Sequence, residues 1–361
     1  MTAAAPPRPV RRRARPDGRS LVLRRGAASV VVRPRSVVVG AALAVLLVGT
    51  CVVSLAVGDF PVPPARVLRS LLGAGERRDD FVVLDLRLPR VVCGVLVGAA
   101  FGLSGALVQA AARNPLASPD VLGVTSGATA AAVAAIVLGA PGGLALPGAA
   151  LAGGTGAALV VLLLAARRGV VGVRLVLVGI GVSAALQAVV SYLLVEADVA
   201  QAQAATVWLT GSLNGRGWTQ VVTVGAAVAV LLPVALLLAR PVAVLQFGDD
   251  TARGLGVRVG ATRGAVVLLA VALAALATAA AGPIAFVALA APQIAARLAR
   301  APGLPLATSA LVGAVLVTVA DLLARRLLAP TDLPVGVVTA VLGAPFLLWL
   351  LARASRGEGR R

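Results

Sequence analysis

The sequence RNPLASPD, from Arg113 to Asp120, lies between two long apolar runs of this chain. A second polar island, GDDTARGLG at residues 248–256, interrupts the apolar sequence again. Proline and glycine break helices, so each island predicts an irregular connection between helices. Neither island carries the groups that hydrolysis or redox chemistry needs. The two stretches therefore predict connecting segments of a helical protein whose movement is driven by another component.

The composition around these islands is that of a membrane protein. The 361 residues are 59% hydrophobic and only 13% charged, whereas about 25% charged residues is usual in soluble domains. The apolar residues come in runs of about 20, which is the length that crosses a bilayer as a helix. We therefore predict an all-α polytopic membrane protein.

About ten transmembrane helices are expected. The eighth is short and opens with Gly282-Pro283, which favours a re-entrant or offset helix. Residues 1–36 are predicted to be a basic tail without regular structure, 37–352 the membrane domain and 353–361 a second tail. The apolar runs lie near 37–57, 91–111, 121–139, 147–166, 173–195, 221–239, 264–281, 284–298, 305–328 and 335–352.

The net charge of +19 reflects membrane orientation rather than nucleic-acid binding. All basic residues are arginine, and ten of them lie between Arg8 and Arg35, ahead of the first apolar run. No groove of basic and aromatic residues is indicated. With both termini in the cytoplasm, 24 arginines lie inside and nine outside, which obeys the positive-inside rule. The sequence thus predicts a multi-pass protein of the cytoplasmic membrane.

The sequence argues against an enzyme. It has no histidine and no lysine, so neither a Cys/His metal site nor a P-loop is expected, and no cofactor is predicted. The pairs Asp79-Asp80 and Asp249-Asp250 suggest a membrane prenyltransferase only weakly, because no further carboxylate follows at helical spacing. Asp321 lies within a span, where carboxylates often relay protons. A pair with Arg325 one turn later is the better interpretation, which weakens a proton-driven secondary transporter without removing it.

Motifs in both halves resemble those of the FecCD-type permeases, the membrane subunits of ABC importers for iron–siderophores, haem and vitamin B12. The resemblance covers residues 37–352 and implies ten helices per subunit. The motifs are RLPR at 87–90, GAA at 98–100, RNPLA at 113–117, GDDTARGLG at 248–256, GPIAFV at 282–287, APQ at 291–293, LPVG at 333–336 and GAPF at 343–346, with Asp321 and the Ala324-Arg325 pair.

The resemblance implies that the loop 240–263 couples the permease to a cytoplasmic ATPase. Its expected coupling residues are Gly248, Asp249, Thr251, Ala252, Arg253, Leu255 and Gly256. Gly248 and Gly256 permit sharp turns, and Asp249 and Arg253 are expected to pair with or cap the short helices. An ordinary cytoplasmic loop is the alternative.

The resemblance also implies that Arg87, Arg90 and Arg325 meet acidic residues of an extracytoplasmic binding protein. The alternative is that Arg325 only pairs with Asp321 and the other two anchor a helix at the lipid headgroups. A structural or gating set is expected at Arg113, Asn114, Pro115, Gly282, Pro283, Pro292, Gln293 and Asp321.

One departure bears on the substrate. Many members have histidine where this chain has Gln293, and the glutamine form resembles the ferric enterobactin permeases, as does WLTGSLNGRGW at 208–218. A ferric siderophore, of the catecholate class, is therefore preferred over vitamin B12 or haem. The expected partners are a second permease, identical or different, two ATPase subunits, a siderophore-binding protein and membrane lipid, but no nucleic acid.

Overall fold

The computed structural model describes residues 21–25, 28–32, 34–139, 144–166, 173–300, 305–328 and 331–358, and these form an all-helical bundle with one short hairpin. Strands β1 (Leu21–Arg25) and β2 (Ala28–Val32) pair antiparallel, with Leu21 opposite Val32. The prediction of a tail without regular structure missed this hairpin. Valine and leucine in both segments favour extended strands, which explains the difference.

Each of the ten predicted apolar runs holds one helix. In the part of the chain that the structure describes, seven helices are long and apolar enough to cross a membrane, and three apolar helices are shorter. α5 and α12 have 14 and 13 residues, so each rises only about 20 Å against a hydrocarbon core of about 30 Å. The ten are α1 (Pro34–Ala56), α4 (Leu88–Ala112), α5 (Val124–Val137), α6 (Ala145–Ala166), α7 (Val173–Glu196), α9 (Trp218–Leu245), α11 (Val259–Ala281), α12 (Val287–Ala299), α13 (Leu306–Arg326) and α14 (Val335–Glu358).

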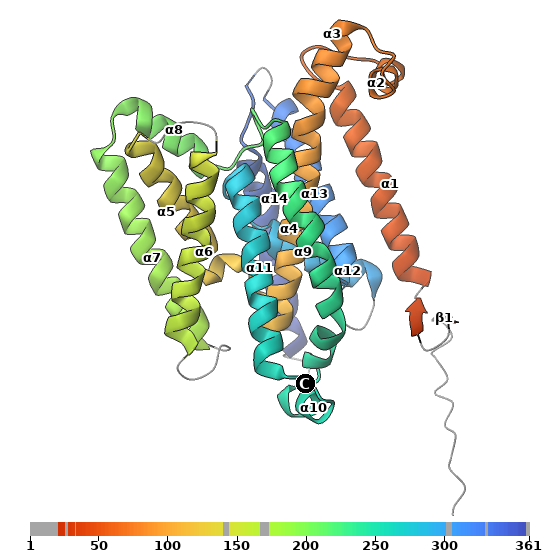
Figure 1. Cartoon of the computed structure of the whole chain (residues 1–361), viewed down its shortest axis with the longest axis vertical. Helices are drawn as coiled ribbons and strands as arrows, with labels where there is room; N and C mark the ends of the chain where they lie inside the picture. The colour runs from red at the N-terminus through yellow and green to blue at the C-terminus, as the bar shows by residue number, and fades with distance from the viewer. Residues whose placement is uncertain are drawn as a thin grey trace, which may run out of the picture.

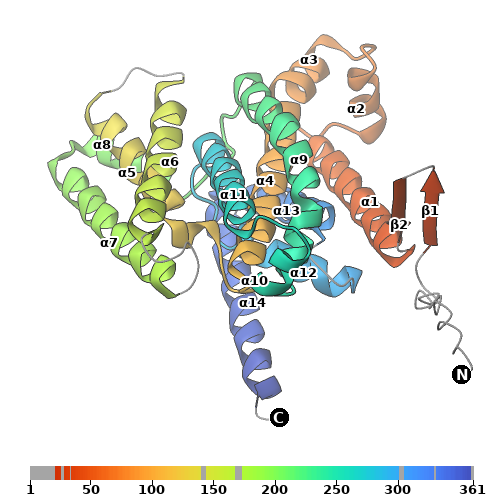
Figure 2. The same cartoon turned by 60° about the horizontal axis from the view of Figure 1, so that its bottom comes forward.

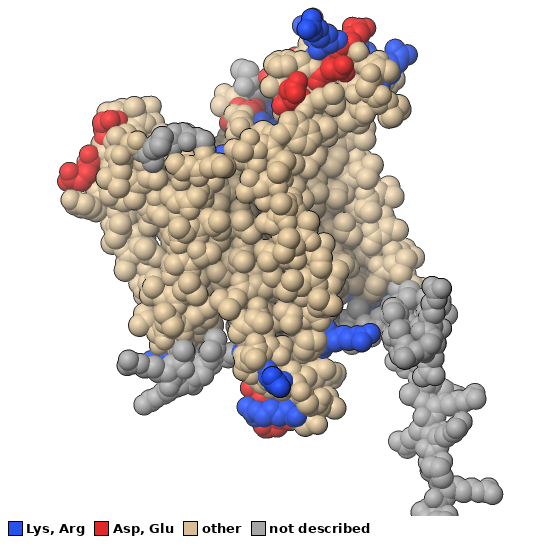
Figure 3. All heavy atoms as spheres, viewed as in Figure 1, with Lys and Arg blue, Asp and Glu red and all other residues tan. Residues whose placement is uncertain are grey.

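Short helices mark the two ends of the bundle. α2 (Pro64–Leu71) and α3 (Arg77–Asp80) lie at one end and α10 (Asp249–Gly254) at the other (Figure 1). We call these the α3 end and the α10 end. Charged side chains gather at both, and the visible band between them is uncharged (Figure 3). This distribution is that of a protein whose middle lies in lipid.

α8 (Val199–Leu209) is a further helix at the α3 end that the sequence analysis did not anticipate. Its 11 residues are too few for a span, and two glutamines interrupt its apolar pattern. Asp198 accepts a hydrogen bond from the Gln201 backbone N–H at 2.8 Å, and the Gln201 side chain accepts one from the Asp198 backbone N–H. This capping box starts the helix, and it could have been found in the sequence.

α4 is the central helix and packs against α9, α11, α12 and α13 (Figure 2). It continues without a break from α3 through the π-helix η1 (Phe81–Arg87), so that residues 77–112 form one helical rod. Glycine lets α13 approach it closely: a Cβ atom at Gly98 would lie 2.4 Å from the backbone oxygen of Gly313. The abundant small residues thus serve helix packing, as expected in lipid.

Three helix ends meet at a joint formed by Gly211, Gly282 and Gly336. α11 ends at Ala281, and Gly282 follows with a φ of 76°, which favours glycine. The short helix that was expected to open with Gly282-Pro283 begins only at Val287. The Ser212 N–H donates to the Ala281 carbonyl at 2.8 Å, and the Gly336 N–H to the Gly211 carbonyl at 3.1 Å. The joint therefore binds the ends of α8, α11 and α14 together.

Candidate functional site

α10 forms a small knob at the α10 end of the molecule. Gly248 and Gly256 flank it with φ values of 103° and 80°, which confirms the predicted sharp turns. Ala252 is buried against Leu245 and Val259, so the knob packs on α9 and α11 through one small side chain. The outward side chains are exposed and mixed in character: Phe247, Thr251, Arg253 and Leu255.

Asp249 fastens this knob to the bundle. Its carboxylate forms ion pairs with Arg113, which follows α4, and with Arg263 in α11, the latter at 2.9 Å. Arg253 instead pairs with Asp250 at 2.7 Å, and Gly248 provides no side-chain cap. The expectation that Asp249 and Arg253 pair or cap locally therefore holds only for Arg253. Arg263 was missed, because its partner was not identifiable from sequence spacing.

The beginning of the RNPLA motif, at 113–115, contacts the APQ motif at 291–293. Arg113 has a φ of 49° and ends α4, and Asn114 accepts a hydrogen bond from the Leu116 N–H at 2.9 Å. The Gln293 amide donates to Gln109 Oε1 at 2.7 Å and to the Pro115 carbonyl at 3.2 Å. We call this contact the glutamine contact; it ties α12, just after the buried Pro292, to the end of α4.

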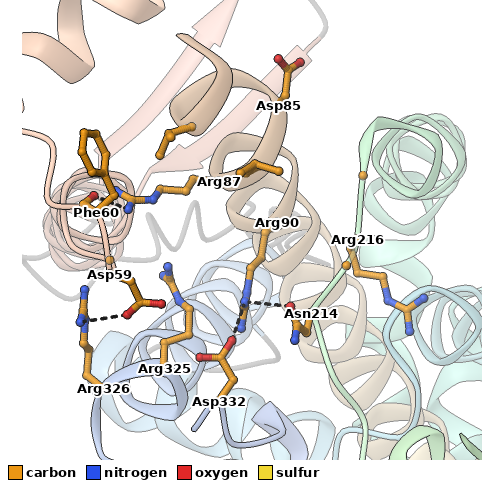
Figure 4. A pocket seen from close by; sticks show the side chains of 15 residues that line it. Asp59, Phe60, Asp85, Arg87, Arg90, Asn214, Arg216, Arg325, Arg326 and Asp332 are labelled. Atoms are coloured by element: carbon orange, nitrogen blue, oxygen red, sulfur yellow. Dashed lines mark hydrogen bonds and ion pairs between the residues drawn. The ribbon is translucent and has the colours of Figure 1, made fainter. Parts of the chain in front are cut away.

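At the α3 end, arginines from distant segments surround a cavity of about 510 Å³, the arginine cavity (Figure 4). All three predicted docking arginines line it. Its charged and amide side chains are Asp59, Asp85, Arg87, Arg90, Asn214, Arg216, Arg325, Arg326 and Asp332. The cavity thus brings α1, η1, α4, the loop before α9 and the end of α13 to one place.

Asp321 is held between two arginines beside this cavity. Its carboxylate receives Arg90 Nη2 at 2.9 Å and Arg325 Nε at 3.3 Å, so the predicted Asp321–Arg325 pair is confirmed. The side chains of Asp321, Arg90 and Arg325 are only 4%, 12% and 11% exposed. Arg90 also reaches Asp332 at 3.3 Å. The charges are therefore largely compensated inside the protein.

The other cavity arginines differ in their contacts. Arg87 donates to the carbonyls of Leu55 at 2.7 Å and Phe60 at 2.5 Å, and thereby satisfies the end of α1. Burial lowers the pKa of the Arg216 guanidinium, although arginine stays protonated in proteins. Arg326 is 32% exposed and lies 4.0 Å from Asp59. Arg326 is thus the more accessible cation of the rim.

Sequence reasoning missed Asn214, Asp332 and Arg326 as neighbours of the predicted arginines. Asn214 lies within the WLTGSLNGRGW motif and Asp332 directly precedes LPVG, so the motifs were recognised without their contacts. Arg90 and Asp321 are 231 positions apart, and Arg90 and Asn214 are 124 apart. Only the tertiary fold brings them together.

Between the two ends, polar side chains reach an open groove of about 400 Å³ beside the glycine joint. Asp120 and Thr125 are hydrogen-bonded to each other there, and Thr210 also lines the groove. Among the described residues no group of three metal-ligating side chains occurs, and Cys51 and Cys93 are free thiols. The side chains that line the arginine cavity and this groove offer charge and hydrogen bonds.

Comparisons with known proteins agree with this arrangement. The sequence profile of the FecCD transport family matches residues 37–353. The chain is 48% identical to an achromobactin transport system permease protein of Dickeya dadantii, over 86% of this chain and 90% of that protein. It is 43% identical to a ferric enterobactin transport system permease protein of Escherichia coli, over 86% and 96%.

An iron(3+)-hydroxamate import system permease protein of Bacillus subtilis is 38% identical, over 89% of this chain and 98% of that protein. A solved structure, described as an inward-facing conformation of a metal-chelate type ABC transporter, superposes with a TM-score of 0.78 at 28% identity. That superposition covers 87% of this chain and 99% of the other. The likeness therefore extends over the whole helical bundle.

Proposed function

Since the chain belongs to the FecCD transport family, we propose that it is the permease subunit of an ABC importer that carries a ferric siderophore into the cytoplasm. The support is that relatives named for ferric or siderophore transport match it over most of their length. We place it in the cytoplasmic membrane with both termini inside, which puts the α10 end in the cytoplasm and the α3 end outside. The distribution of arginine supports this orientation.

We propose that α10 is the contact for a cytoplasmic ATPase, one copy on each of two paired permease subunits. The knob offers a rigid, small surface with an exposed aromatic, an aliphatic and a cationic side chain: Phe247, Leu255 and Arg253. Such a mixture suits a docking surface, since apolar anchors supply affinity and charges supply orientation. Asp249 then passes the movement of the knob to α4 and α11.

The arginine cavity is the proposed contact for an acidic surface of the binding protein. With Asp321, which pairs with Arg90 and Arg325 beside it, the cavity combines five arginines with four aspartates and so keeps one net positive charge. Electrostatic complementarity of this kind raises the association rate and fixes orientation. Since Arg87 and Arg90 are held by internal partners, they act by the field that they create, and Arg326 supplies a direct contact.

Transport would follow alternating access. Closure of the ATPases would move α10 and, with it, Asp249. The ion pair between Asp249 and Arg113 would pass this movement to the loop after α4, whose Pro115 carbonyl is hydrogen-bonded to Gln293. The groove at Asp120 and Thr125 adjoins the glycine joint, where helix ends can reorient without breaking long helices. We propose that the chelate crosses intact, since the described residues hold no group of three metal-ligating side chains.

For the substrate, we propose a ferric siderophore of the catecholate class. This proposal rests on Gln293 and on the likeness to ferric enterobactin permeases, while the other relatives are named for achromobactin and hydroxamate transport. The test is uptake of radioactive iron by cells with and without this gene, offered as catecholate or hydroxamate chelate, with cyanocobalamin as control. Loss of catecholate uptake alone supports the proposal, and loss of hydroxamate uptake alone overturns the substrate class.

A second measurement separates the substrate from the mechanism. The purified permease with its ATPase subunits is placed in vesicles, and ATP hydrolysis is measured with and without the loaded binding protein. Hydrolysis that the loaded binding protein stimulates supports the ABC importer for any chelate. Uptake that continues without ATP and responds to a proton gradient would contradict it and favour a secondary transporter.

A further inference from the structure

An apolar groove lies between α12, α13 and α14, away from the arginine cavity and from α10. It encloses about 170 Å³, and among the described residues that line it none is charged. α12 contributes Ala290 and Ile294, α13 Leu316, and α14 Leu342 and Phe346. Apart from Thr339, its lining residues are apolar, which suits a hydrocarbon chain.

The groove has the length of one membrane leaflet. On α12 it begins at Phe286 and passes Ala290 and Ile294, and Arg297 lies one turn beyond on the same face. The eleven residues of α12 from Val287 to Arg297 rise about 16 Å along the helix axis, which is about half of the roughly 30 Å hydrocarbon core. An acyl chain in the groove would therefore have its headgroup near Arg297.

A cation closes the groove at that headgroup level. The Arg297 guanidinium lies 5.8 Å from the ring centre of Phe346 and 5.0 Å from that of Trp349, and its Nη1 donates to the Gln293 carbonyl at 3.5 Å. Phe346 is also part of the groove wall, so the apolar groove and the cation adjoin. Stacking fixes the plane of a guanidinium, whose N–H donors point from its edge and suit a phosphate.

Two further arginines lie near Arg297 at the end of α12. Arg300 ends α12 with an exposed side chain, and Arg35 donates to the Leu298 carbonyl at 3.0 Å. Three arginines thus lie within one turn of the end of α12. Arginines at a helix C-terminus also favour the helix dipole, but that role requires neither the aromatic stack nor the adjoining groove.

We propose that this groove binds one anionic phospholipid of the leaflet at the α10 end, with an acyl chain along Ile294 and Leu342 and the phosphate at Arg297. Charge complementarity selects the anionic headgroup, because each basic side chain near the surface favours anionic lipid. Trp349 marks the interface, where tryptophan is enriched. This binding is independent of the cargo and requires only the membrane.

Trp349 makes the proposal measurable. The assembled transporter, with its ATPase subunits, is placed in phosphatidylcholine nanodiscs that contain brominated phosphatidylglycerol or, separately, brominated phosphatidylcholine at the same fraction. Bromine quenches nearby tryptophan, and the same complex with Trp349→Phe supplies the signal of all other tryptophans for subtraction. We expect half-quenching of Trp349 at about fivefold less phosphatidylglycerol than phosphatidylcholine, from the attraction of one arginine.

Variants separate the headgroup from the chain. Arg297→Gln should remove the preference for phosphatidylglycerol, and Ala290→Leu, which fills the groove, should weaken quenching by both lipids. Arg174→Gln is the matched control, because Arg174 is exposed at the start of α7, away from the groove. Equal quenching by both lipids in the unaltered transporter would overturn the proposal. Quenching by neither would also overturn it, since a second permease copy would then cover the groove.

Discussion

The two ends of the molecule each hold one carboxylate between two arginines, but in different surroundings. At the α3 end, Asp321 lies between Arg90 and Arg325, and all three side chains are at most 12% exposed. At the α10 end, Asp249 lies between Arg113 and Arg263; Asp249 and Arg113 are 30% and 34% exposed, while Arg263 is 10% exposed. The same arrangement of charges is therefore buried at the α3 end and partly exposed to solvent at the α10 end.

This difference separates a fixed surface from a movable one. A buried pair cannot lose one partner without leaving a charge uncompensated, which costs about 3–5 kcal/mol. A partly exposed pair can open because water replaces the lost partner, so its contribution is nearer 1 kcal/mol. We infer that the Asp321 cluster holds the arginine cavity in shape, while the Asp249 cluster lets α10 move and return.

The largest expected effect is that of Asp321→Asn. It leaves Arg90 and Arg325 without their shared carboxylate and should lower the free energy of unfolding by about 3–5 kcal/mol. Thermal unfolding in detergent measures it, with Asp332→Asn as the matched control, since Asp332 is 38% exposed. A melting temperature equal to that of the unaltered protein would show that the cluster does not hold this end together.

Asp249→Asn tests the other end. It should lower the unfolding free energy by less than Asp321→Asn does, because Asp249 and Arg113 are partly exposed although Arg263 is buried. It should lower the substrate transported per ATP hydrolysed about tenfold, because α10 loses its links to α4 and α11. Reconstituted vesicles give both rates. Should transport and hydrolysis fall in equal proportion, Asp249 would be a general structural residue rather than a coupling one.

Arg253→Glu tests whether the exposed surface of α10 contacts the ATPase. Arg253 is 61% exposed and pairs with the fully exposed Asp250, so stability should stay nearly unchanged. Reversing its charge should still uncouple hydrolysis from uptake several-fold by opposing the ATPase. Arg174→Glu, an exposed arginine on α7, is the control. Normal uptake by the Arg253 variant would count against α10 as the coupling helix.

The smallest effect is expected from Arg326→Gln at the rim of the arginine cavity. Loss of one rim charge should slow association of the binding protein about two- to threefold and leave its dissociation rate nearly unchanged. Surface-binding kinetics at low and high salt measure both rates, and the difference should shrink as salt screens the charges. A change confined to dissociation would show that Arg326 makes a buried contact instead.

The sequence predicted the spans well because the length of an apolar run is a local property. α5 and α12 were recognised although they are short, because Gly and Pro mark their limits. α8 was missed, since an 11-residue helix with two glutamines carries no membrane signal. The hairpin in the N-terminal tail was also missed, because strong basic charge outweighed its valines in the interpretation.

Residues of the candidate site could be identified from the sequence, but most contacts between them could not. Asp321 and Arg325 are one helical turn apart, so their pair was predictable from spacing. Arg90 joins them across 231 positions, and Arg263 meets Asp249 only after α11 packs beside α10. Pairing across the fold depends on how helices pack, which a single sequence does not state. The roles of these residues in docking and coupling stay predictions.

The continuous helix from residue 77 to 112 gives the molecule a lever arm. Arg90, about a third of the way along this helix, belongs to the Asp321 cluster, and Arg113 just past its C-terminal end belongs to the Asp249 cluster. The two arginines are separated by about 35 Å of helix, so a tilt of about 5° about the fixed end displaces the other by about 3 Å. A displacement of that size at α10 thus needs no bending of α4, because α4 can pivot about the buried Asp321 carboxylate.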